Sequence, residues 1–131
     1  MKESKKEALR WLRQAENDFA YAQIGLRERF YAQVCFQCQQ ICEKALKAIH
    51  YGKLDARVVI GHSLVGLTKE LDFDRELLDE MAVLDQSYIP TRHPNGLPGG
   101  TPFEVYTKTQ AENAIRVSRS IIQLATKAVS E

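Results

Sequence analysis

Apolar residues recur every three or four positions between residues 30 and 51, and this spacing predicts one long amphipathic helix. Its apolar stripe consists of Val34, Cys38, Ile41, Cys42, Ala45, Leu46 and Ile49. The neighbouring face is polar and carries Gln37, Gln40, Glu43, Lys44 and Lys47. Because a helix with one apolar stripe must bury that stripe against other helices, we expect this helix to be the central member of a bundle.

The same spacing predicts four more helices along the chain. They cover about residues 5–27, 62–71, 101–129 and a stretch that begins after Asp72 or Asp74 and ends near 87. The short charged break between the first two long helices indicates that they are antiparallel neighbours. We therefore predict one all-α domain over residues 1–131, an antiparallel up-and-down four-helix bundle with an additional short helix.

Two connections are long enough to carry function. In residues 52–61 we expect Gly52 to adopt the left-handed conformation after a helix end, and Val58, Val59 and Ile60 to form a buried plug. Residues 88–100, YIPTRHPNGLPGG, hold three of the four prolines and three of the seven glycines, which predicts a loop. Loops on a rigid scaffold are common places for functional residues.

Composition and charge bear on the compartment in which the protein works, but they identify no ligand. The formal net charge is +1, so the total charge favours no particular partner. We expect no contact with a membrane, because no apolar run approaches the ~20 residues needed to span a bilayer. Cys35, Cys38 and Cys42 are odd in number and share nearly one helix face, which favours a reducing compartment and a cytoplasmic location.

The three cysteines also raise the question of a metal. Thiolates spaced three and four residues apart could share a tetrahedral zinc ion, but no fourth ligand lies at a typical spacing. Free cysteine is among the most buried residue types, so we favour packing in the core. We expect no metal and no cofactor.

Several short stretches together resemble the HEPN domain family over about residues 8–128. They are Trp11 with Ala15 and Asp18, the run 36–48 (FQCQQICEKALKA), His62-Ser63-Leu64 with Leu67, the loop 88–94, and Glu104, Tyr106, Ala111 and Ala114. The resemblance implies a helical bundle that commonly forms a homodimer and is linked to nucleotides or RNA. Many similar small prokaryotic proteins work beside a minimal nucleotidyltransferase in toxin–antitoxin-like systems.

Some branches of that family are metal-independent ribonucleases that use an Arg and a His a few residues apart. Arg57 and His62 are separated by four residues, although Val58 lies where those enzymes usually carry a polar residue. Arg92 and His93 are adjacent in the second loop, where His93 replaces the aromatic residue of the more usual Arg-Tyr-Pro. Such a pair suits RNA cleavage, because a neutral imidazole can accept the 2′-hydroxyl proton while a guanidinium stabilises the phosphorane charge.

Each pair has a plain structural alternative. His62 could cap the third helix beside a solvated Arg57, and Arg92 could pair with a carboxylate at a helix end. The remaining candidates for ligand binding are Lys44, Lys47 and Tyr88, together with Arg92. For the lysines the alternative is an ordinary ion pair between Glu43 and Lys47 along the helix.

Three functions stay open on this evidence. The first is a HEPN-type module that binds nucleotide, RNA or a partner nucleotidyltransferase. The second is a metal-independent ribonuclease, and the third is a structural homodimer subunit without a ligand.

Overall fold

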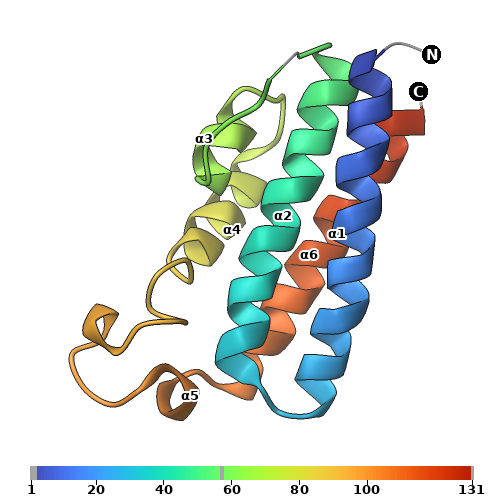
Figure 1. The fold of residues 1–131 in the computed structure, drawn as a ribbon. Helices are drawn as coiled ribbons and strands as arrows, with labels where there is room; N and C mark the ends of the chain where they lie inside the picture. Colours follow the sequence, from blue (N-terminus) through green and yellow to red (C-terminus); the bar gives the residue numbers. More distant parts are fainter. Residues whose placement is uncertain (1–2, 57, 131) are drawn as a thin grey trace.

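The computed structural model describes residues 3–56 and 58–130, and within them the regular structure is helical with no strand. The helices are α1 (Glu3–Arg27), α2 (Tyr31–Lys53), α3 (Leu64–Lys69), α4 (Arg75–Asp85), α5 (Pro102–Val105) and α6 (Lys108–Ser130), with a 3-10 turn, η1, at Pro94–Gly96. Figure 1 shows α1 and α4 running in one direction and α2 and α6 in the other. The predicted all-α, up-and-down bundle with an additional short helix is therefore confirmed.

Helix α2 is the centre of the fold, as its apolar stripe predicts. It contacts each of the other five α-helices, and 15 of its 23 residues are buried. Four of the buried residues are polar: Gln39, Glu43, Lys47 and His50. The burial of Glu43 and Lys47 differs from the exposed polar face that the sequence pattern indicates. The difference arises because α3, α4 and the connection before α3 cover that side of α2 (Figure 1).

The end of α2 lies later than predicted. Gly52 is inside the helix, and Leu54 is the C-cap, so the expected left-handed glycine after residue 51 is wrong. A Cβ atom at Gly52 would lie 3.4 Å from Cγ2 of Val129 and 3.5 Å from Cβ of Ala8. The missing side chain lets the end of α2 approach α1 and α6 closely.

The predicted buried plug on the connection is wrong for two of its three residues. Val58 is 75% exposed and Ile60 is 81% exposed. Only Val59 is partly buried against the core, and its backbone N–H donates to the hydroxyl of Tyr51 at 3.1 Å. Side chains alternate in an extended segment, so turning Val59 inward places its two neighbours outward.

The last predicted helix is divided in two. Thr101 and Glu104 form the expected capping box, but α5 ends at Val105 and Tyr106 is extended, with a ψ of 138°. A second start follows, in which Thr107 and Gln110 exchange side-chain and backbone hydrogen bonds. None of the described helices is both long enough and apolar enough to cross a membrane.

The start of α3 is fixed by a carboxylate from α4. Asp85 accepts hydrogen bonds from the backbone N–H groups of Leu64 at 2.8 Å and Val65 at 3.1 Å, and from the hydroxyl of Ser63 at 3.3 Å. These N–H groups have no partner within the helix, so Asp85 acts as a cap supplied from another element. It joins the connection before α3 to the end of α4.

We predict that Asp85→Ala lowers the free energy of unfolding by about 1–3 kcal/mol, because the groups that it binds lose their acceptor. Urea unfolding followed by circular dichroism measures the change. The matched control is Asp79→Ala on the same helix, which removes an exposed pair with Arg75 and should cost under about 0.5 kcal/mol. Equal losses for the two variants would contradict the capping role.

Candidate functional site

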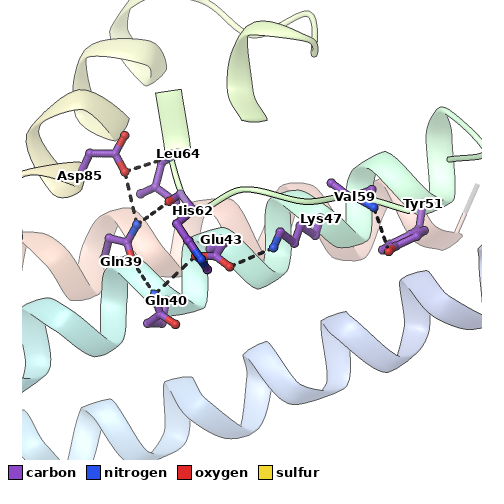
Figure 2. A network of polar contacts seen from close by, with 9 residues as sticks. All are labelled: Gln39, Gln40, Glu43, Lys47, Tyr51, Val59, His62, Leu64 and Asp85. Atoms are coloured by element: carbon purple, nitrogen blue, oxygen red, sulfur yellow. Dashed lines mark hydrogen bonds and ion pairs between the residues drawn. The ribbon is translucent and has the colours of Figure 1, made fainter. Parts of the chain in front are cut away.

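A buried carboxylate on α2 holds His62 at the surface (Figure 2). Nδ1 of His62 lies 3.1 Å from Oε1 of Glu43, while Nζ of Lys47 donates to Oε2 of Glu43 at 3.0 Å. Glu43 and Lys47 are each only 5% exposed, whereas the His62 side chain is 64% exposed. The carboxylate is thus satisfied from both sides, and one of its partners is an accessible imidazole.

The backbone at His62 is fixed by a second buried group of α2. Nε2 of Gln39, which is fully buried, donates to the carbonyl oxygen of His62 at 2.9 Å and also lies 3.3 Å from Oδ1 of Asp85. Oε1 of Gln39 accepts from Gln40 at 2.8 Å. Two successive turns of α2 therefore position the main chain and the ring of His62 (Figure 2).

Aromatic rings bring the loop after α4 to the same place. The ring of Tyr88 stacks on His62 with a centroid distance of 5.5 Å and an interplanar angle of 22°. The guanidinium carbon of Arg92 lies 4.8 Å from the centroid of Tyr88 and 4.4 Å from that of Phe36. Nε of Arg92 donates to the carbonyl oxygen of Tyr88 at 2.9 Å. His62 and Arg92 therefore share one aromatic neighbour, and we call His62, Tyr88 and Arg92 the surface cluster.

The structure brings together His62 from the first predicted Arg–His pair and Arg92 from the second, because both contact the ring of Tyr88. Arg57 lies outside the described residues. His93 is exposed, and its imidazole makes no hydrogen bond, ion pair or ring contact with the described part of the chain. Ser63, rather than His62, caps α3, with its hydroxyl accepting from the N–H of Gly66 at 3.0 Å. No carboxylate of a described residue pairs with Arg92. The ion pair at a helix end, which was the structural alternative for Arg92, therefore does not form within the described chain.

Both lysines of the predicted binding group already contact carboxylates. Lys47 pairs with Glu43, as the helical spacing predicts, and its ammonium also lies 5.2 Å from the centroid of Trp11. Lys44 forms an ion pair with Asp18 of α1. A binding role for the two lysines stays a prediction.

The geometry of the surface cluster suits acid–base chemistry beside an anion. When Nδ1 of His62 carries the proton and donates it to Glu43, Nε2 keeps a free lone pair toward solvent and can act as a base. The Nε bond and the two aromatic rings fix Arg92 while its terminal nitrogens stay available for a phosphate. Orienting a histidine through its second nitrogen is a common device in functional sites.

The sequence analysis missed Gln39 and Asp85, and it gave Glu43 no part in positioning His62. No spacing rule could find these contacts, because Gln39 and Glu43 are separated from His62 by 23 and 19 residues. The one signal was the resemblance, whose run 36–48 contains both residues of α2.

The cysteines form a separate, buried group. All three are free and pack in the core, and no cluster of His, Cys, Asp and Glu suited to a metal occurs among the described residues. Burial raises the pKa of the Cys35 and Cys38 thiols from 9.0 to about 12, and it raises the pKa of Cys42 further. Thiols in such surroundings are poor nucleophiles at neutral pH.

Fold and site together define an all-helical bundle with an exposed His–Tyr–Arg cluster at the junction of two loops. The family model for the HEPN domain matches residues 8–129, so the chain belongs to the HEPN domain family.

Solved structures agree with this assignment. TT1696 from Thermus thermophilus is 35% identical, with 93% of this chain and 98% of that one covered and a TM-score of 0.87. ST0689, described as an archaeal HEPN homologue, is 28% identical, with 98% and 99% covered and a TM-score of 0.80. Among curated proteins, "Putative toxin MJ1304" of Methanocaldococcus jannaschii is 22% identical over 127 residues, which cover 87% of this chain and 82% of that protein.

The reactivity of the buried thiols of α2 reports how tightly the core is packed beneath the surface cluster. We predict that Cys35, Cys38 and Cys42 react slowly with a chromogenic disulfide at pH 8 in the folded protein, and that all three react at once in guanidinium chloride. The folded state keeps the thiol protons at higher pH than the unfolded chain, so the free energy of unfolding falls as pH rises from 9.0 toward about 12. Rapid labelling of a folded thiol would contradict the packing.

Proposed function

We propose that this HEPN protein is a toxin-like module that binds RNA at the surface cluster and cleaves it without a metal ion. The observation that carries the proposal is the convergence of His62 and Arg92 on the ring of Tyr88, with the imidazole exposed and the guanidinium free of carboxylates among the described residues. A proton acceptor beside an unneutralised cation is what cleavage through the 2′-hydroxyl requires.

The chemistry follows from the roles of these groups. Nε2 of His62 accepts the proton of the 2′-hydroxyl, and the 2′-oxygen attacks the adjacent phosphorus. Arg92 stabilises the negative charge on the phosphorane oxygens. The bond from phosphorus to the 5′-oxygen then breaks, that oxygen takes a proton from water, and the hydroxide so formed takes back the proton that His62 accepted. A 2′,3′-cyclic phosphate remains. Glu43 stabilises the imidazolium through Nδ1.

We also propose a homodimer and a minimal nucleotidyltransferase as partner. The exposed Val58 and Ile60 favour the homodimer, because they lie on the segment that leads to His62 and would be buried by a second copy. The partner rests on the resemblance and on the toxin description of the relative from M. jannaschii. A nucleotide is the alternative ligand at Arg92. Binding assays with nucleotide and with RNA distinguish the two.

We predict that the wild-type protein cuts single-stranded RNA in EDTA, and that His62→Ala and Arg92→Ala each slow cleavage by about 10²–10⁴-fold. Product analysis by gel electrophoresis and detection of the cyclic phosphate measure the reaction. Arg27→Ala removes an exposed guanidinium at the far end of α1 and should cut as wild type does.

His93→Ala tests which of the two histidines is the base. The imidazole of His93 makes no contact with a described residue that would orient it, unlike that of His62. Unchanged cleavage assigns the base to His62, and loss of cleavage assigns it to His93 instead. RNA that stays intact with wild-type protein rejects the enzyme. If RNA and nucleotides also fail to bind, and a minimal nucleotidyltransferase does not co-elute with the protein, the structural homodimer without a ligand is the remaining function.

The dimer gives an independent prediction. In size-exclusion chromatography with light scattering, we expect the wild type to be a dimer and Val58→Lys to be a monomer, because the charge prevents burial of the exposed segment. Val83→Lys is the matched control, since Val83 is an equally apolar, exposed residue on α4. A monomeric wild type, or a dimer that survives Val58→Lys, would contradict this interface.

A further inference from the structure

A broad groove runs along α1 beside α2 and belongs to no part of the surface cluster. Its volume is about 820 Å³. Its lining includes Lys6, Glu7, Arg10, Trp11, Arg13 and Lys44, together with Leu9, Gln14 and Asn17. Lys6, Arg10, Arg13 and Asn17 recur at helical spacing on one side of α1, so the groove follows the helix axis.

The groove concentrates positive charge in a chain whose formal net charge is only +1. Four of its lining residues are basic and one is acidic. Arg13 forms no ion pair or hydrogen bond within the described part of the chain. Lys44 is already paired with Asp18, so the charge open to a ligand comes from α1. Lys6 and Arg10 pair only with Glu3 and Glu7 of the same helix, and such exposed pairs are weak enough for a polyanion to displace.

The acidic residues gather on the opposite side of α2. The stretch 70–85, which includes α4, contains seven acidic residues and one arginine. Figure 1 shows α1 and α4 on opposite sides of the central helix. The charged surface of α1 therefore offers a polyanion contacts that the acidic face of α4 does not offer.

The groove is joined to the surface cluster through α2. Trp11 lines the groove and lies under the ammonium of Lys47, which pairs with Glu43, the partner of His62. Lys44 lines the groove and directly follows Glu43 on the same helix. Three successive contacts therefore link the groove to His62, which lies on the adjoining side of α2.

We propose that the groove along α1 binds the sugar–phosphate backbone of a single RNA strand whose reacting phosphate lies at the surface cluster. The inference rests on the proposed function and extends it to a second, sequence-independent contact. A positively charged groove is the usual way to follow a single-stranded backbone. The apolar residues of the lining, Leu9 and Trp11, are partly buried, and none of the large apolar residues exposed in the described chain lies there.

The test compares salt dependence of binding for two variants that lose the same charge. Arg10→Gln/Arg13→Gln removes two cations from the groove, and Lys108→Gln/Lys127→Gln removes two exposed cations from α6. Neither lysine of α6 forms an ion pair with a described residue. The ligand is a fluorescent 2′-O-methyl oligonucleotide, which cannot be cleaved, and fluorescence anisotropy gives its affinity in KCl over a range of about 0.05–0.3 M, chosen for its strong salt effect.

We expect the groove variant to lower the slope of log K against log salt by about 1.4, which is ~0.7 for each lost phosphate contact of a single strand. By the same relation its affinity at about 0.1 M salt falls roughly 25-fold. The α6 variant should keep the wild-type slope. Equal slopes for wild type and groove variant, or an equal loss in the α6 variant, overturn the groove.

Cleavage by the same proteins separates the two proposals. If RNA is cut through His62 while the groove variant binds as wild type, the groove is wrong and the proposed function stands. If the groove variant loses its slope while wild type cuts no RNA, the groove stands and the cleavage is wrong.

Discussion

The geometry of the surface cluster depends on the free-energy cost of burying the carboxylate of Glu43. Glu43 lies on the helix that all others surround, where an unpaired charge would be expensive. Lys47 supplies one partner from the next turn, but a carboxylate has two oxygens, and the second is satisfied by His62. Because the buried carboxylate needs this second hydrogen-bond partner, it holds the exposed imidazole of His62 in place. It also sets which ring nitrogen faces inward and which one faces solvent.

The same constraint connects the two loops that carry the surface cluster. Gln39 is buried on α2 and must satisfy its amide, which it does with the carbonyl of His62 and the carboxylate of Asp85. Asp85 in turn caps α3 and ends α4, directly before the loop that carries Tyr88 and Arg92. Segments that are distant in sequence are therefore tied to one helix through polar groups that cannot reach water. Rigid placement of loop residues in this way is what a functional site needs.

Local spacing predicted the long helices but not the division of the last one at Tyr106. Apolar residues every three or four positions predicted the long helices and the central place of α2, because burial of one stripe is a property of each helix by itself. Contacts between distant polar residues have no such signature, so the bond from Glu43 to His62 and the cap from Asp85 could not be predicted. The outward turn of Val58 and Ile60 was missed for a related reason, since hydrophobicity alone indicates burial and not which alternate residue of an extended segment receives it. Arg92 was correctly placed in a loop, but its aromatic neighbours come partly from α2.

The way in which Arg92 is held bears directly on what it can do. It follows an acid-rich helix, yet within the described chain it rests on Phe36 and Tyr88 and on no carboxylate. An ion pair would fix the guanidinium and at the same time cancel its charge, whereas an aromatic face fixes it and leaves the charge intact. His62 is held in the opposite way, with the carboxylate of Glu43 behind its ring and the rest of the side chain exposed to solvent. A free cation beside a supported base is the arrangement that the proposed cleavage requires.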